Sequence, residues 1–67
     1  MESNKPDDID VRFLQALADD KRQIEASEAA CRSISSMEQR IRRLRAERGI
    51  DTLTGLVAAG FREGWLK

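Results

Sequence analysis

The 67-residue sequence predicts an all-α domain of four helices in a helix-turn-helix arrangement. Apolar residues recur at helical spacing in several segments, helix start and stop signals flank these segments, and strand-like alternation is almost absent. Turns of about two to five residues would join the helices, as in other compact all-α units. We expect a flexible lead over residues 1–6 and a single domain over residues 7–67.

Composition and length restrict the classes of protein to which the chain can belong. The sequence is 40% hydrophobic and 36% charged, and it has no apolar run near the roughly 18 residues of a membrane span. Its polar, acidic start does not resemble a signal peptide, so we expect a cytoplasmic protein. A single cysteine excludes an intramolecular disulfide. Histidine, paired cysteines and a glycine-rich phosphate loop are absent, so we expect no enzyme activity, metal or cofactor.

The zero net charge hides an asymmetry between the two halves of the chain. The first 31 residues carry four basic and eight acidic side chains, whereas residues 32–67 carry eight basic and four acidic ones. A positive half of this kind fits a polyanionic partner. The neutral total counts against strong non-specific binding to DNA.

The first helix begins after Pro6, with Asp7 or Asp8 as its cap, and should run to about Ala18. Its apolar residues fall at helical spacing and would form one side of the core. They are Ile9, Phe13, Leu14 and Leu17.

The second helix is expected from about Arg22 to Cys31, after a charged joint that includes Lys21. Its side chains are mostly small, which would let another helix cross closely. Lys21 and Arg22 lie at its N-terminus, where free amides favour a phosphate, although both could equally be solvated surface charges. We expect Cys31 to be a small core or helix-end residue.

The third helix is expected over residues 35–48, because Ser35 and Glu38 form a capping-box pattern and Gly49 is a stop signal. Its inner seam consists of Met37, Ile41 and Leu44. Its outer face carries Ser35, Ser36, Gln39, Arg42, Arg43 and Ala46, with Arg40 on the flank. Small hydroxyls let a helix approach DNA, glutamine can pair with adenine, and arginine can pair with guanine or phosphate. This face therefore predicts a helix that reads the major groove.

The fourth helix would be capped by Asp51 or Thr52. Its wide apolar stripe consists of Leu53, Leu56, Val57, Gly60 and Phe61, and Trp65 and Leu66 close the chain. Its other side carries Gly55, Ala58, Ala59 and Arg62. These small residues could pack against a second copy of the helix, or they could be exposed alanines.

With helices two to four in place, the sequence resembles the DNA-binding domain of LuxR/GerE-type bacterial regulators over about residues 9–66. The matching positions of the pattern are Ser33, Ser36, Met37, Leu44, Gly49 and Ile50, followed by an ending from Thr52 to Leu66. The departures fall mainly in and before the turn, where Cys31 stands for a glycine and Arg32 for an apolar residue. Farther along, Arg40 stands for a histidine and Arg48 for a core leucine.

The resemblance implies double-stranded DNA as the ligand, bound by helix three, and a homodimer formed through helix four. We therefore expect a sequence-specific transcriptional regulator that binds two half-sites. Gln39 and Arg43 would read base edges, while Arg40, Lys21 and Arg22 would hold phosphates. The full set of expected DNA contacts is Lys21, Arg22, Ser33, Ser35, Ser36, Gln39, Arg40, Arg42 and Arg43.

Two other hypotheses follow from the same residues. The chain could be a protein-interaction module that does not bind DNA, whose arginines pair with an acidic partner or with Asp7, Asp8 and Asp10 of another copy. It could instead be one piece of a longer regulator whose sensor domain is missing. Separately, a regulatory protein could be a partner of the chain. The start at Met1 and the short polar lead favour a stand-alone gene product.

Overall fold

All regular structure in the described part of the chain, residues 6–67 of a computed structural model, is helical. The helices are α1 (Asp8–Ala18), α2 (Gln23–Ala29), α3 (Ile34–Arg48) and α4 (Leu53–Glu63). The prediction of an all-α chain with four helices is therefore confirmed. The predicted lead over residues 1–6 lies outside the described residues except for Pro6.

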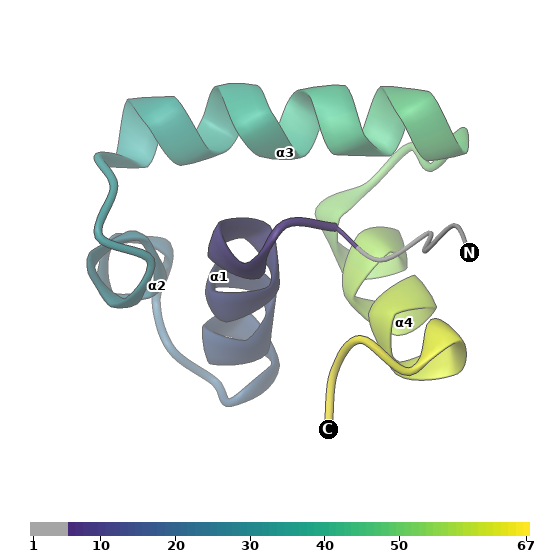
Figure 1. Cartoon of the computed structure of the whole chain (residues 1–67), viewed down its shortest axis with the longest axis horizontal. Helices are drawn as coiled ribbons and strands as arrows, with labels where there is room; N and C mark the ends of the chain where they lie inside the picture. The colour runs from purple at the N-terminus through teal and green to yellow at the C-terminus, as the bar shows by residue number, and fades with distance from the viewer. Residues whose placement is uncertain (1–5) are drawn as a thin grey trace.

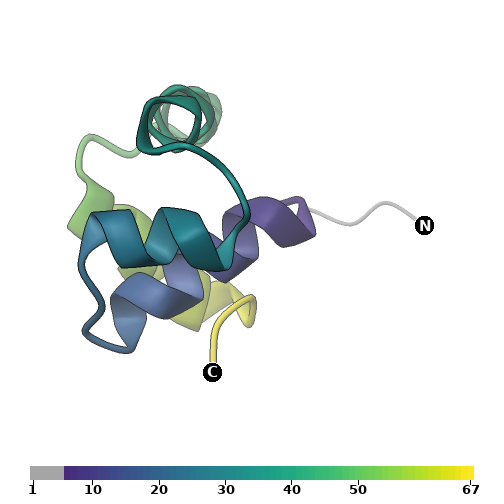
Figure 2. The same cartoon turned by 90° about the vertical axis from the view of Figure 1, so that its left-hand side faces the viewer.

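The longest helix, α3, lies by itself along one side of the molecule (Figure 1). Below it, α2 lies near its N-terminal end, α4 near its C-terminal end, and α1 between them. A view along the axis of α3 shows that its outer side is not covered by any other segment of residues 6–67 (Figure 2). α1 lies between α2 and α4 and, like α3, contacts each of the other three helices, so it forms the centre of this arrangement.

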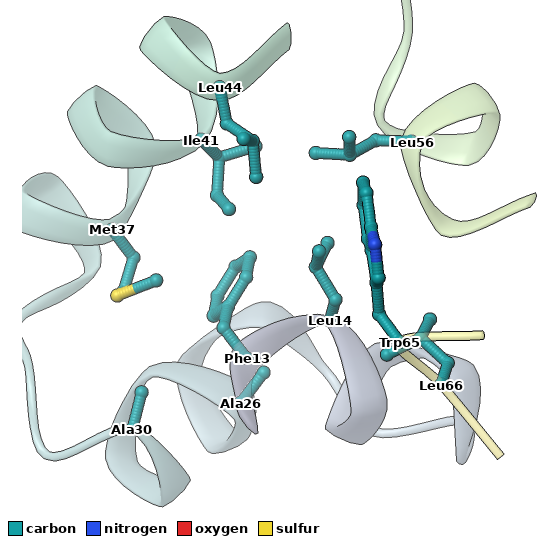
Figure 3. Close-up of a cluster of buried hydrophobic side chains, with 10 residues drawn as sticks. All are labelled: Phe13, Leu14, Ala26, Ala30, Met37, Ile41, Leu44, Leu56, Trp65 and Leu66. Carbon is teal, nitrogen blue, oxygen red and sulfur yellow. The ribbon is translucent and has the colours of Figure 1, made fainter. Parts of the chain in front are cut away.

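One apolar cluster joins the four helices and the C-terminal segment (Figure 3). Met37, Ile41 and Leu44 point from α3 toward Phe13 and Leu14 of α1, as the predicted inner seam requires. The other buried members of the cluster are Ala26, Ala30, Leu56, Trp65 and Leu66. Burial of this seam fixes the rotation of α3 about its own axis, and so it decides which side chains face solvent.

α3 begins at Ile34, one residue before the predicted start, and its N-cap lies two residues before the predicted cap. Ser33, not Ser35, is the N-cap, and its hydroxyl accepts a hydrogen bond from the Ser36 N–H at 3.1 Å. The third helical residue is then a serine rather than Glu38, so the predicted capping box does not form. Ser33 lies next to the first apolar residue of the seam side, Ile34, which becomes half-buried in the first turn.

Other local signals did set helix boundaries as predicted. α1 ends at Ala18, and Gly49 ends α3 with φ +67°, a left-handed conformation that suits glycine. Thr52 caps α4 by accepting from the Gly55 N–H at 2.9 Å. Each of these signals acts within a few residues of its own position, and this is why the sequence suffices to predict them.

The second helix is shorter than the prediction, because it ends at Ala29 rather than near Cys31. Ala30 is its C-cap, and Cys31 then adopts a left-handed conformation with φ +59°. The thiol of Cys31 is exposed, so the core alternative for this residue is wrong. A left-handed residue redirects the chain sharply, and here it turns the backbone from α2 into α3.

The buried face of α4 is rotated relative to the predicted stripe. Ala59 is only 3% exposed, whereas Phe61, predicted to be buried, is 49% exposed. The cause is the C-terminal segment, which folds back so that the backbone N–H of Trp65 donates to the Gly60 carbonyl at 2.8 Å. A Cβ atom on Gly60 would lie only 2.7 Å from Leu66, so this close return requires glycine there. Trp65 and Leu66 thus fill the space that Phe61 would otherwise occupy.

Two further contacts hold the C-terminal segment in place. The guanidinium of Arg48 lies over the Trp65 ring, 4.4 Å from its centroid, which is a cation–π geometry. The Gln15 side chain forms two hydrogen bonds with the backbone of Lys67, at 2.9 and 3.1 Å. Arg48 thus lays its charged end on the aromatic face of Trp65.

The contrast between buried and exposed large side chains gives a test of the fold. Leu56 is completely buried, whereas Ile24 on α2 is 57% exposed. We expect Leu56→Ala to lower the free energy of unfolding by about 2–5 kcal/mol, because it leaves a cavity in the core. The matched variant Ile24→Ala should change it by less than about 0.5 kcal/mol. Urea titrations followed by circular dichroism would measure both, and equal losses would contradict this packing.

Candidate nucleic-acid interface

The outer face of α3 is a continuous exposed surface of polar and basic side chains. The seam of Met37, Ile41 and Leu44 turns the opposite residues toward solvent. The outer face consists of the exposed Ser35, Gln39, Arg42, Arg43 and Ala46 and the half-buried Ser36. The orientation predicted from helical spacing is therefore confirmed for this group.

The dimensions of the outer face suit a groove of duplex DNA. From Ser35 to Ala46 the helix rises by about 16 Å, and its side chains are free along this length. The major groove is about 12 Å wide and admits one α-helix. An α-helix that lies along the groove fits this width, and Arg42 and Arg43 lie in the C-terminal half of the exposed length.

Arg40 is the residue of α3 whose surroundings differ most from the prediction. Its Nε donates to Asp10 Oδ1 at 2.9 Å, and its Nη2 donates to Asp7 Oδ2 at 3.1 Å. The hydrogen bond with Asp10 is the main cause that raises the pKa of Arg40, and the charges of both carboxylates add to it, against a smaller opposing effect of burial. Arg40 thus faces the start of α1 instead of projecting freely from the outer face.

The two carboxylates that hold Arg40 have different environments. The Asp10 side chain is 11% exposed, whereas that of Asp7 is 78% exposed. A buried carboxylate needs its charged partner, because an unpaired charge is costly to bury. An exposed ion pair contributes little. We infer that Asp10 with Arg40 anchors α3 to α1, and that Asp7 adds a weak second contact.

No pattern in the sequence predicts the contact between Asp10 and Arg40. Asp10 and Arg40 are 30 residues apart, so helical spacing gives no signal for the pair. The interaction-module hypothesis did join the arginines of this helix with Asp7, Asp8 and Asp10, but it placed the two groups in different copies. In the structure, Asp7 and Asp10 pair with Arg40 within one chain.

Three other predicted contact residues do not join the outer face. The hydroxyl of Ser33 caps α3 and is engaged with the Ser36 N–H. Lys21 and Arg22 are exposed, but the joint that carries them lies on the side of the molecule away from α3 in both views (Figures 1 and 2). α2 has only seven residues, so its N-terminus gives little support for a phosphate site. Their contacts with phosphate stay predictions.

A shallow groove of about 310 Å³ follows one flank of α3 and leads to the start of α1. It contains basic and acidic side chains in equal number. Its lining consists of Pro6, Asp7, Asp10, Arg40, Arg43, Leu44, Glu47 and Arg48. Because Asp7 and Arg43 share this groove, the carboxylate of Asp7 stands beside the basic outer face.

The residues predicted for a dimer interface on α4 separate into two groups. Ala58 and Arg62 are exposed, in agreement with such a role. Ala59 is buried in the core and cannot contact a second copy, which corrects that part of the prediction. Gly55 is half-covered, and a Cβ atom there would lie 3.1 Å from Ile50 and Thr52. Phe61, which was not among the predicted interface residues, is exposed on α4, whereas Ala59 is not.

Other kinds of site find no support in the described residues. Between residues 6 and 67, no group of three or more potential ligands could hold a metal ion. In the same range, none of the helices combines the length and apolar character that crossing a membrane requires.

Comparison with known proteins found no matching family model, no similar curated protein and no similar solved structure.

The different burial of the two carboxylates leads to a prediction about stability. Asp10→Asn removes the charge that neutralises a half-buried arginine, so we expect a loss of about 1–3 kcal/mol in the free energy of unfolding. Asp7→Asn removes an exposed partner of the same guanidinium and should cost less than about 1 kcal/mol. Both values can be measured by urea denaturation at neutral pH. A larger loss for Asp7→Asn than for Asp10→Asn would contradict the assignment of the anchor.

Proposed function

We propose that this protein is a sequence-specific DNA-binding transcriptional regulator whose recognition helix is α3. The single observation that carries the proposal is the outer face of α3, a free polar and basic surface on a helix anchored along its opposite side. Such a helix can enter the major groove as a rigid unit. Because the anchoring residues are buried, the backbone positions from which the exposed side chains project are fixed relative to one another.

In this proposal, base readout comes from the middle of the outer face. Gln39 can form two hydrogen bonds with adenine, and Arg43 can do the same with guanine. Near the two ends of the contact, further hydrogen bonds with base edges and phosphates come from Arg42, Ser35 and Ser36. Side chains that touch phosphates orient the helix, whereas those that touch bases give the sequence preference.

The path of the chain from α2 to α3 supports a helix-turn-helix of the LuxR/GerE type. α2 ends at Ala29, four residues turn the backbone, and α3 begins at Ile34. Within that turn the left-handed residue is Cys31, at the position where the family pattern has glycine. Glycine is the residue that most easily adopts this conformation, so the backbone fits the family pattern even though the side chain departs from it.

A homodimer is part of the proposal, because one unit of this size makes few contacts with DNA. The exposed side of α4 offers Ala58, Phe61 and Arg62 to a second copy. Phe61 supplies the large apolar side chain that an interface of small residues lacks. Two recognition helices about one helical turn of DNA apart would then read a two-fold repeat.

The contribution of Arg43 can be tested by substitution. We expect Arg43→Ala to cost about 1–3 kcal/mol of binding free energy on a preferred site and to relax the preference at one base pair. Arg12→Ala, which removes an exposed arginine from α1, is the matched control and should leave the preference unchanged. Fluorescence anisotropy titrations on a set of single-base variants of the site would measure both effects. Unchanged binding of Arg43→Ala to every duplex would exclude Arg43 from base readout.

The interaction module that does not bind DNA is the alternative, favoured by the zero net charge and by the exposed apolar side chains Ile24 and Phe61. Titration of random duplex DNA with salt separates the two functions. A DNA binder that makes six or more phosphate contacts should lose about a thousandfold in affinity or more between 50 and 200 mM salt. The absence of measurable binding at 20 mM salt would contradict the DNA-binding function and favour the module.

A further inference from the structure

Asp7 occupies the N-cap position of α1, yet its carboxylate does not cap that helix. Aspartate is among the best N-cap residues, because its side chain can accept hydrogen bonds from free amides of the first turn. Here Asp7 Oδ2 instead accepts from Arg40 Nη2 on another helix, at 3.1 Å. The side chain is therefore turned away from its own helix and toward the basic flank of α3.

The two carboxylates hold different parts of one guanidinium. Asp10 takes the Nε–H and is nearly buried, whereas Asp7 takes an N–H of Nη2 and is largely exposed. A guanidinium has five N–H donors and commonly binds a phosphate or a carboxylate with two of them at once. Asp10 thus fixes where Arg40 lies, while Asp7 occupies a donor that a phosphate of DNA could otherwise use.

The position of Arg40 makes such competition relevant. Arg40 lies on the flank of the outer face, three residues before Arg43, and both line the groove that also contains Asp7. Glu47 also lines this groove, and a phosphate that approaches the flank meets the exposed carboxylate of Asp7 beside the guanidinium groups of Arg40 and Arg43. The carboxylate repels the phosphate directly and also withholds a hydrogen-bond donor from it.

We propose that Asp7 is an electrostatic brake that keeps Arg40 from contacting the DNA backbone. This inference rests on the proposed DNA-binding function and adds an inhibitory contact to it. Because the Asp7–Arg40 pair is exposed and weak, its removal frees Arg40 without disturbing the anchor to Asp10. The brake lowers the affinity for random DNA, where phosphate contacts supply nearly all of the binding. It leaves readout of base edges to Gln39 and Arg43.

The test compares Asp7→Asn with Asp8→Asn on a random-sequence 20-base-pair duplex. Asp8 is exposed, lies beside Asp7, and forms no ion pair within residues 6–67, so its substitution removes the same charge without freeing Arg40. One added phosphate contact should steepen the dependence of log affinity on log salt by about 0.9 in Asp7→Asn. We expect the affinity of that variant at 50 mM salt to rise about fivefold, and that of Asp8→Asn by less than about twofold.

Two further variants test whether the gain passes through Arg40. Asp7→Asn should give no gain in affinity when it is combined with Arg40→Gln, relative to Arg40→Gln alone. Circular dichroism establishes that each variant is folded, and if Arg40→Gln does not fold, the comparison of Asp7→Asn with Asp8→Asn decides. Equal affinities and equal salt dependence for these two would overturn the brake while leaving the DNA-binding function intact. No binding by the unmodified protein or by any variant at 20 mM salt would overturn both.

Discussion

The packing of one side of α3 against α1 is the interaction on which the rest of the structure depends. Met37, Ile41 and Leu44 meet Phe13 and Leu14, and all five side chains are buried. With this seam fixed, the side chains on the opposite side of α3 face solvent, whereas Arg40, Arg45 and Arg48 on its flanks contact other parts of the fold. α2 and α4 then support the two ends of the same helix (Figure 1). The other three helices thus hold α3 with one face exposed, and we infer the function of the protein from that face.

The arginines of this helix, although close in sequence, have different roles. Arg42 and Arg43 are exposed on the outer face. Arg40 is tied to Asp10 at 2.9 Å, and Arg48 lies over the ring of Trp65. Arg45 is half-buried and donates to the backbone carbonyl of Asp51. Three of the five arginines of α3 therefore make contacts within the fold, so the surface available to a polyanion is smaller than the sequence suggests. The domain thus has a basic surface on α3 although its net charge is zero.

Features that are set by residues close together in the sequence could be predicted. Features that are set by contacts between distant residues could not. Gly49 and Thr52 mark helix ends through contacts within a few residues, and helical spacing orients the seam of α3. The burial of α4 depends instead on where Trp65 and Leu66 return, which no local pattern gives; Phe61 and Ala59 were therefore assigned to the wrong sides. The outer face of the candidate site was predictable for the same reason as the seam. The partners of Arg40, which lie 30 and 33 residues away, were not.

We propose that the outer face of α3 reads base pairs. This can be tested by selecting bound duplexes from a random pool and sequencing them. A random pool contains every short target, so the preferred site does not have to be chosen beforehand. The selection is carried out at a salt concentration near 150 mM, where non-specific binding is weak. We expect enrichment of one short motif, present as a two-fold repeat with half-sites about one helical turn apart. A bound pool whose sequences remain as random as the input would contradict it.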